Sequence, residues 1–481
     1  MNIVYNEVLV YDTLGKNEFF NSNISNYDVH PWHTGDYSRL KEFEINENIK
    51  LPYRRKGDES QDLLDKLNRF RSQSFEVFLD HDYSRHHRYT VDEISGKGIN
   101  YIYPIIIYSN EIFEKYDTID INEKVIKDAL IGNCKICFMQ PTEGFFGQSV
   151  QNYVWLNNLS NKYGLSSKSL FIITTNFIAK ESKQQLENLN HIEKGKFTIL
   201  EYSYFSSNLW FHHPGHVTDP HSDIEGRKLL SDFVTSSLTK KKRYHFLNFN
   251  RIPKLHRVIL FGVLKGKEIF KDKFITSMGG HPDESKDFYH NWVHGQVPPI
   301  YEKGWKNDIL KFYSTHDSRE HAWYDDPDLE NNKADSFNIK AHTESFVNIV
   351  SESLISSDTV FFSEKIYKPI FAAQPFILVG NPNSLRKLKD EGYRTFDKWW
   401  DESYDSETDF HCRMDKIIKV MEEIATWDMD KCFKVTQEMM PDLIHNYNVL
   451  MSGNTLKELL KDLDKFEEIK QNIKVPPKNL I

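Results

Sequence analysis

The sequence predicts an α/β protein with two doubly wound domains, each built on a parallel sheet, and with helices at the C-terminus. Three observations lead to this prediction. Short apolar runs alternate with helical stretches from residue 101 onward, which is the pattern of consecutive βαβ units. This pattern stops in a polar, histidine-rich stretch near residues 211–221 and resumes after residue 240. The length, 481 residues, also favours more than one domain.

Composition narrows the classes of function. Charged residues make up 27% and hydrophobic residues 39% of the chain, which excludes a mostly disordered protein. The formal net charge of −9 opposes general binding of nucleic acid but allows a local basic site. Met1–Leu9 lacks the basic and apolar regions of a signal peptide, and no apolar run is long enough for a membrane span. We therefore expect a cytoplasmic protein.

The first α/β domain is expected over residues 101–225. The apolar run Tyr101–Tyr108 predicts a strand, and Pro104 favours an edge position because proline donates no ladder hydrogen bond. Val150–Tyr163 predicts a helix. Further strands are expected at Lys135–Gln140, Ser169–Thr175 and Phe197–Phe205. Residues 1–100 show no clear pattern.

The second α/β domain is expected over residues 226–405, with an irregular insertion at 281–340 that is rich in Asp, Pro, Trp and His. Strands are predicted at Tyr244–Phe249, Phe274–Met278, Phe346–Ile349, Thr359–Phe362 and Pro375–Gly380, with helices at Pro253–Lys265 and Glu364–Ala373. The remaining residues, 406–481, are expected to form C-terminal helices.

The stretch Thr359–Gly380 is the most informative about chemistry. Ser363 is expected to cap a helix that has Glu364 and Lys365 in its first turn. A helix N-terminus attracts phosphate, and Lys365 adds a full positive charge beside it. Glu364 can accept hydrogen bonds from two ribose hydroxyls. The stretch therefore favours a nucleotide diphosphate site, and the alternative is an ordinary capped helix with a surface Glu–Lys pair.

A second stretch, Tyr244–Lys265, points to the same chemistry. A predicted strand leads through a polar turn with Asn248 into a helix that carries Arg257. The planar guanidinium of arginine suits phosphate oxygens. Taken alone, an arginine at this position is more often a solvated helix residue.

In their order, the segments Phe246–Arg257, Ser345–Ser353 and Phe361–Lys365 resemble the donor half of the α1,3/4-fucosyltransferase family, over about residues 240–385. The resemblance implies a GT-B fold, in which two Rossmann-like domains face each other across a cleft. It also implies that Arg257 and Lys365 hold the donor diphosphate and that Glu364 holds the ribose. The remaining donor-binding residues that it implies are Asn248, Ser353, Phe361 and Ser363. Ser353 and Phe361 stand where the family has Asn and Tyr, which leaves the sugar and the nucleobase open.

The expected activity is that of an inverting glycosyltransferase, with a GDP-sugar such as GDP-fucose favoured as the donor and a glycan as the acceptor. Such an enzyme needs a base for the acceptor hydroxyl and positive charge for the leaving diphosphate. Glu143, in the turn after the predicted strand Lys135–Gln140, is the candidate base. His212, His213 and His216 are the alternatives. No divalent metal is expected to be essential, although Asp80-His81-Asp82 would be the place for a metal-bridged diphosphate.

Two other functions remain open from the sequence. One is a glycosyltransferase that acts on modified DNA bases, which the acidic net charge disfavours. The other is a non-catalytic α/β protein that binds a sugar or a phosphate, which would consume no donor. The sequence leaves the acceptor and the oligomeric state open.

Overall fold

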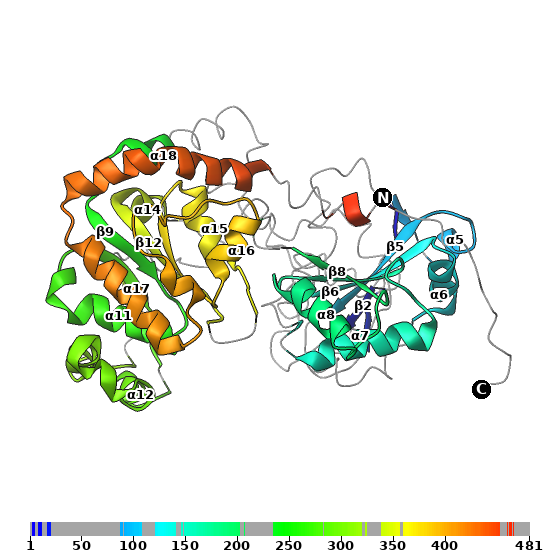
Figure 1. Cartoon of the computed structure of the whole chain (residues 1–481), viewed down its shortest axis with the longest axis horizontal. Helices are drawn as coiled ribbons and strands as arrows, with labels where there is room; N and C mark the ends of the chain where they lie inside the picture. The colour runs from blue at the N-terminus through cyan, green and yellow to red at the C-terminus, as the bar shows by residue number, and fades with distance from the viewer. Residues whose placement is uncertain are drawn as a thin grey trace, which may run out of the picture. The chain divides into compact units, whose positions relative to one another are not determined.

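The computed structural model describes residues 2–4, 8–11, 17–20, 87–89, 91–107, 121–140, 146–147, 149–202, 206, 234–281, 283–319, 323–324, 338–355, 359–452, 459, 461–463 and 465. The chain forms two compact units (Figure 1). Unit 1 consists of Met1–Tyr202 and Leu456–Ile481, and unit 2 consists of Ser203–Thr455. The boundary thus falls earlier than the expected one near residue 225, and the expected C-terminal group 406–481 is divided between the units.

Unit 1 is built on a mainly parallel sheet. Its strands in the described part of the chain are β1 (Asn2–Val4), β2 (Val8–Tyr11), β3 (Asn17–Phe20), β4 (His87–Tyr89), β5 (Tyr101–Ile107), β6 (Cys134–Gln140), β7 (Leu170–Thr174) and β8 (Thr198–Glu201). The order is β3-β2-β5-β6-β7-β8, with β1 paired to β4 and β5, and only β2 and β3 run antiparallel. Among the described residues of the first 100, four strands are present, and none is longer than four residues, so each leaves only a weak pattern in the sequence.

The expected edge position of Pro104 is wrong, because β5 lies between two neighbours. Pro104 pairs with Cys137 of β6. On the opposite side β1 pairs at Ile102, and β2 pairs from Ile105 onward. Pro104 thus lies between the residue that pairs with β1 and the first residue that pairs with β2. No hydrogen bond to a neighbour is needed there, so an interior strand can contain a residue without an N–H group.

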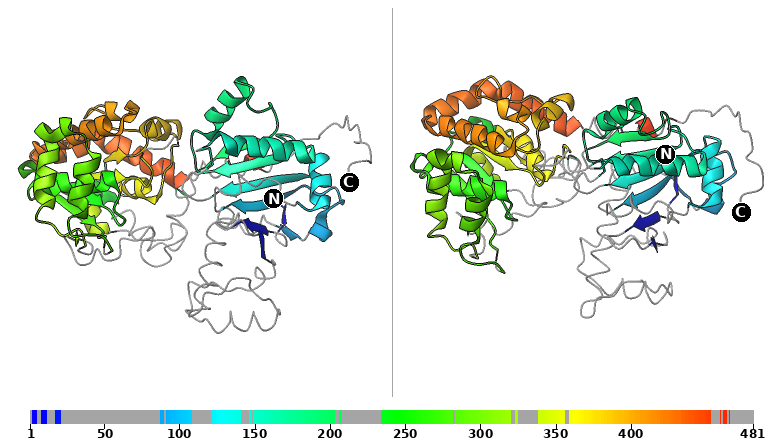
Figure 2. Two further views of the ribbon diagram at one scale, coloured as in Figure 1. Left: turned by 90° about the horizontal axis from the view of Figure 1, so that it is seen from below. Right: turned by 60° about the horizontal axis from the view of Figure 1, so that its bottom comes forward.

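Helices α5 (Val91–Ile94), α6 (Glu123–Leu130), α7 (Val150–Tyr163) and α8 (Ala179–Asn188) belong to unit 1 (Figure 2). Strand β6 is buried along its whole length, as expected for a strand covered on both faces. The ring of Trp155 on α7 meets that of Phe138 on β6 edge to face, with the centroids 5.2 Å apart. Packing of α7 against the sheet therefore forms the centre of this core.

The C-terminal segment is held in unit 1 by one buried lysine. Lys135 of β6 donates from Nζ to the carbonyls of Asp462, Leu463 and Lys465, at 2.8, 2.8 and 2.7 Å. Its ammonium also lies 5.0 Å from the centre of the Phe171 ring. A buried ammonium needs such partners because loss of hydration is costly, so this contact fixes the segment to the sheet.

Unit 2 contains a second parallel sheet in the order β11-β10-β9-β12-β13, in which only β11 is antiparallel. The strands are β9 (Tyr244–Phe249), β10 (Phe274–Met278), β11 (Trp323–Tyr324), β12 (Ser345–Ser351) and β13 (Phe376–Val379). The predicted strand at Thr359–Phe362 is wrong. These residues are buried but join no ladder, so their apolar character reflects burial in an extended connection.

The helices that the structure describes in unit 2 include α11 (Leu255–Gly266), η5 (Glu268–Phe270), α12 (Phe288–Gln296), η6 (Pro299–Tyr301), η7 (Glu302–Lys306), α13 (Asn307–Tyr313), α14 (Ile339–Glu344), α15 (Glu364–Phe371), α16 (Ser384–Asp390), η9 (Ser403–Ser406), α17 (Phe410–Ala425) and α18 (Met429–Ser452). Among the helices that the structure describes, none has the length and hydropathy to cross a membrane.

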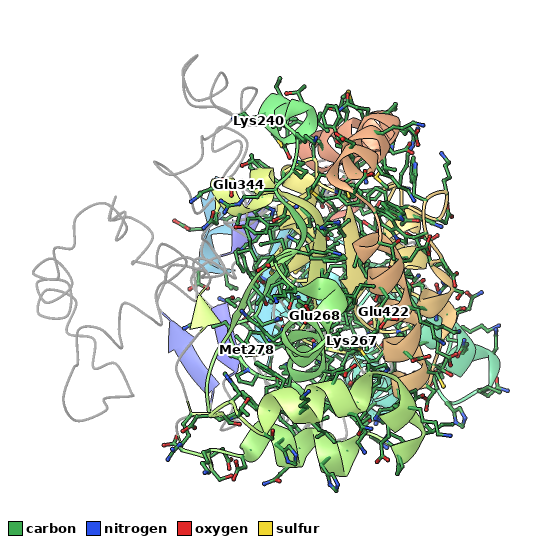
Figure 3. All side chains as sticks on the ribbon, turned by 90° about the vertical axis from the view of Figure 1, so that its left-hand side faces the viewer. Lys240, Lys267, Glu268, Met278, Glu344 and Glu422 are labelled. Atoms are coloured by element: carbon green, nitrogen blue, oxygen red, sulfur yellow. The ribbon has the colours of Figure 1, made fainter. Side chains whose placement is uncertain are left out.

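The middle of the expected irregular insertion is helical and packs on the core. Gly262 of α11 allows this close approach, since a Cβ atom there would lie 2.6 Å from Cγ2 of Ile309 on α13. The hydroxyl of Tyr313 donates to the Val258 carbonyl at 2.8 Å. At the other end of α11, Lys267 forms an ion pair of 2.5 Å with Glu422 of α17 (Figure 3). Helix α11 is therefore fixed by its neighbours along its length.

Candidate functional site

The sheet of unit 2 has a topological switch point between β9 and β12. The chain leaves β9 through α11 to reach β10 on one side, and it leaves β12 through α15 to reach β13 on the other side. In open α/β sheets, ligands bind beyond the carboxyl ends of the strands at such a point. The loop after β12 and the first turns of α11 and α15 therefore form the candidate site.

Three side chains at the start of α11 hold the loop after β12. Lys254 Nζ donates to the Ser353 carbonyl at 2.6 Å. His256 Nε2 lies 3.0 Å from the Glu352 carbonyl. Burial, and to a smaller extent the positive charge of the nearby Arg257, lowers the pKa of His256 to about 3. The ring is therefore neutral and donates this hydrogen bond. The loop is thereby fixed against α11 through its backbone.

Arg257 is the third of these side chains, and it is only 3% exposed. Its Nη2 donates to the carbonyls of Ser351 and Glu352 at 3.1 and 3.2 Å, and its Nη1 donates to Ile252 at 2.8 Å. The structure thus places Arg257 at the predicted end of the sheet, but its guanidinium faces the backbone of two loops.

Glu352 joins the loop to α15. Its carboxylate, 1% exposed, accepts hydrogen bonds from the backbone nitrogen of Ser363 at 3.2 and 3.3 Å and from the Ser363 hydroxyl. Burial raises the pKa of Glu352, although Lys365 acts in the opposite direction. Ser363 in turn caps α15 as predicted, because its Oγ accepts from the Lys365 backbone nitrogen at 3.3 Å.

The predicted Glu364–Lys365 pair is present in the first turn of α15. Lys365 Nζ lies 2.7 Å from Glu364 Oε1 and 3.2 Å from Ser363 Oγ. The side chain of Glu364 is 14% exposed, and that of Lys365 is 25% exposed. Burial alone would raise the pKa of Glu364, but Lys365 and Lys368 outweigh it and the pKa is lowered. Glu364 is therefore ionised at neutral pH and acts as a hydrogen-bond acceptor.

The other proposed donor-binding residues lie deeper in unit 2. Asn248 is fully buried and donates from Nδ2 to the Ile349 carbonyl at 2.8 Å, which ties β9 to β12. Phe361 is 2% exposed and belongs to the core. Ser353 is half-buried, and its carbonyl is the partner of Lys254.

Sequence reasoning missed three residues that shape the site. Lys254 and Glu352 lie inside the stretches that carry the resemblance, so closer attention to those stretches would have found them. Arg413 of α17 has no such signal. It is 2% exposed and donates to the carbonyls of Ile355 and, at 2.7 Å, of Glu407. It thereby holds the loop after β12 at Ile355.

In unit 1, buried amides gather at the carboxyl ends of β6 and β7. Asn176 Nδ2 donates to the Phe146 carbonyl at 2.9 Å, and Asn152 Oδ1 accepts from the Gly147 nitrogen at 3.0 Å. Gln140 Oε1 accepts from the Phe146 nitrogen. These amides anchor the backbone of Phe146 and Gly147.

The candidate base and its alternatives cannot be placed. Glu143, His212, His213 and His216 lie outside the described residues, and so does Asp80-His81-Asp82. Within the described ranges, no group of three or more His, Cys, Asp or Glu side chains is arranged to hold a metal ion.

Comparisons with known proteins add little to this description. No family model matches the chain, and no curated protein matches it. Among solved structures, the N-terminal domain of trehalose-6-phosphate phosphatase from Candida albicans is similar with 10% sequence identity and a TM-score of 0.36. The match covers 90% of this chain and 81% of that chain. A similarity of this strength supports no argument about function. The fold and the site by themselves define a two-unit α/β protein with a cationic site in unit 2.

Proposed function

We propose that the protein is an inverting glycosyltransferase of the GT-B type that transfers a sugar from a nucleotide-diphosphate donor to a carbohydrate acceptor. A GDP-sugar such as GDP-fucose is the favoured donor. In this proposal the donor occupies the switch point of unit 2, and the acceptor is bound by unit 1.

One observation carries the proposal: cationic side chains from three helices surround the loop after β12, where a parallel sheet binds its ligand. Lys254 and Arg257 come from α11, Lys365 from α15 and Arg413 from α17. The buried carboxylate of Glu352 is linked to the same loop. Positive charge at this point favours a ligand with several negative charges, and a nucleotide diphosphate is such a ligand.

The chemistry follows from the side chains. The acceptor hydroxyl oxygen attacks the anomeric carbon, the bond from that carbon to the phosphate oxygen breaks, and the nucleoside diphosphate leaves. Lys365 stabilises the charge on the leaving diphosphate. Glu364, held ionised, accepts hydrogen bonds from the two ribose hydroxyls. Glu143 takes the proton of the acceptor hydroxyl, which completes the balance of the reaction.

A thermal-shift panel without added metal tests donor binding. GDP, UDP, CMP and dTDP are compared on the wild type, on Lys365→Ala and on Lys434→Ala. Lys434 is a matched control because its side chain is 79% exposed on α18. We expect one nucleotide to stabilise the wild type by about 2.7 kcal/mol at a hundredfold excess over its Kd. Lys365→Ala should lose this effect and Lys434→Ala should keep it. No shift with any nucleotide would contradict the proposal.

Turnover separates the transferase from a binding module. The donor that corresponds to the stabilising nucleotide is incubated with a panel of glycans and with hydroxymethylated DNA, and release of the nucleoside diphosphate is measured. Release that depends on a glycan supports the proposal. Saturable binding without release would support a non-catalytic binding protein. Release that depends on DNA would support a glycosyltransferase that acts on modified DNA bases.

A further inference from the structure

We infer that Lys254, rather than Arg257, is the cation of α11 that contacts the diphosphate, and that Arg257 is a positioning residue for the loop after β12. This inference rests on the proposed function, and it assigns the phosphate contact to a residue that the sequence resemblance does not single out. It divides the cations of the site into those that also reach the ligand and those that only hold the loop.

The position of Arg257 argues against a direct contact. Its side chain is 3% exposed, and its two terminal nitrogens donate to three backbone carbonyls, those of Ile252, Ser351 and Glu352. Turning the guanidinium toward a ligand would break these bonds and leave buried carbonyl groups without their donors, which is unfavourable. Arg257 therefore acts on a ligand through the loop that it holds.

Lys254 has the geometry that Arg257 lacks. It is the N-cap residue of α11, its side chain is only partly buried, and its ammonium lies 2.6 Å from the Ser353 carbonyl. The lysine side chain is flexible, and its ammonium is a compact charge with rotatable donors. Because an ammonium has three donors, Lys254 can keep its bond to the Ser353 carbonyl and also donate to a phosphate oxygen beside it.

The two lysines contact residues that are linked to each other by a hydrogen bond. Lys254 contacts Ser353, and the preceding residue, Glu352, binds Ser363 through its carboxylate. The Ser363 hydroxyl lies 3.2 Å from Lys365 Nζ. A diphosphate has two phosphoryl groups, and a lysine from α11 and a lysine from α15 around the same segment match these two groups. The ligand class is thus a nucleoside diphosphate, with inorganic pyrophosphate as its smallest probe.

The test is isothermal titration of the full-length protein with inorganic pyrophosphate and with the nucleoside diphosphate that stabilises it. The variants are Lys254→Ala, Arg257→Lys and Lys265→Ala. Lys265→Ala is the matched control, because Lys265 lies in the last turn of the same helix, is also partly buried and carries the same charge. The melting temperature of each ligand-free variant is measured in parallel, which separates binding from folding.

We expect Lys254→Ala to melt only slightly below the wild type, because one partly buried hydrogen bond is lost, and to bind both ligands about 10- to 100-fold more weakly, the loss typical of one charge-assisted hydrogen bond. Lys265→Ala should bind like the wild type. Arg257→Lys should melt at a lower temperature, because a lysine cannot donate to all three carbonyls, and it should keep pyrophosphate binding at temperatures where it is folded.

Two outcomes overturn the inference in different ways. If Lys254→Ala binds like the wild type while Lys365→Ala does not, Lys254 is not a ligand contact and the proposed function stands. The same holds if Arg257→Lys keeps its melting temperature but loses binding. If the wild type binds neither pyrophosphate nor any nucleoside diphosphate, the inference fails together with the proposed function.

Discussion

The carboxyl ends of the two sheets differ in the kind of side chain that they bury. In unit 2 the loop after β12 is held by charged groups, including Arg257, Glu352 and Arg413. In unit 1 the ends of β6 and β7 bury neutral amides, among them Gln140 and Asn176. Both sets hold a backbone segment in place, but only the charged set also creates a field that attracts an anion. The difference supports a donor site in unit 2 and a neutral, hydroxyl-bearing ligand for unit 1.

The largest effect is expected from removing the central carboxylate of unit 2. Glu352→Ala leaves the backbone nitrogen and the hydroxyl of Ser363 without their carboxylate acceptor, while Lys365 keeps its ion pair with Glu364. Unfolding of unit 2 should become easier by about 3 kcal/mol, because the variant removes the hydrogen bonds of a buried carboxylate and leaves a buried N–H group without an acceptor. Hydrogen exchange of peptides from α15, followed at increasing urea, measures this change.

The matched variant in unit 1 is Gln140→Ala, which removes a neutral partner of the Phe146 nitrogen. It should destabilise its own unit by only about 1–2 kcal/mol, because the lost hydrogen bond involves no charge. Equal effects of Glu352→Ala and Gln140→Ala would remove the contrast between the two sheets.

Lys135→Met tests how the C-terminal segment is fixed to unit 1. Methionine keeps the apolar length of the side chain but cannot donate to the three carbonyls of Asp462, Leu463 and Lys465. We expect a loss of about 2–3 kcal/mol, the contribution of a buried charged hydrogen-bond donor. Limited proteolysis should then cut after residue 455 much faster than in the wild type. The control Lys162→Met changes an exposed lysine of α7 and should leave the cleavage rate unchanged.

Gly147→Ala tests the amide-anchored backbone of unit 1. The φ angle of Gly147 is +93°, and a Cβ atom would lie 2.6 Å from the Tyr153 hydroxyl. Backbone strain and this overlap together should destabilise unit 1 by about 2 kcal/mol. Gly98→Ala is the control, because its φ is +70° but no atom lies within 4 Å of the added methyl group. Equal melting temperatures of the two variants would show that the close approach at Gly147 does not affect stability.

The smallest effect is a dependence of unit 2 on pH. Burial lowers the pKa of His256 to about 3, whereas its unfolded value is about 6.5. Between these values the unfolded chain binds a proton that the folded chain does not, so stability is full above pH 6.5 and falls as the pH falls toward 3. At pH 5.5 the loss from this group is about 1.4 kcal/mol. His256→Gln should flatten the decline measured by urea unfolding between pH 7 and 5.5, and an unchanged slope would contradict the assignment.

His342, whose pKa is also lowered to about 3, adds a second contribution that this variant leaves in place. The difference between the pH slopes of the wild type and of His256→Gln therefore gives the contribution of His256 alone.

Much of the sheet architecture could be predicted from the sequence, because strands buried on both faces are continuous apolar runs. The bounds of β9 and β10 and of helix α7 agree with the expected ones. The same rule failed at Thr359–Phe362, where apolar residues are buried without a ladder. An apolar run in the sequence indicates that a segment is buried. Whether that segment is a strand depends on whether another strand lies beside it.

The candidate site could be predicted only where its parts are local. The cap at Ser363 and the pair formed by Glu364 and Lys365 depend on adjacent residues, so their spacing in the sequence reveals them. The contact of Arg413 with Ile355 joins residues 58 positions apart, and no local pattern predicts it. The resemblance led to Arg257, but its burial depends on the folded loop and could not be seen in the sequence.

The most direct test of the central claim is hydrogen exchange of the full-length protein with and without the nucleoside diphosphate that the thermal panel selects. The account predicts protection in three segments of unit 2: the start of α11, the loop after β12 and the first turn of α15. Protection should disappear in Lys365→Ala and persist in Lys434→Ala. Protection confined to unit 1, or none in these three segments although the ligand binds, would contradict a donor site at the switch point between β9 and β12.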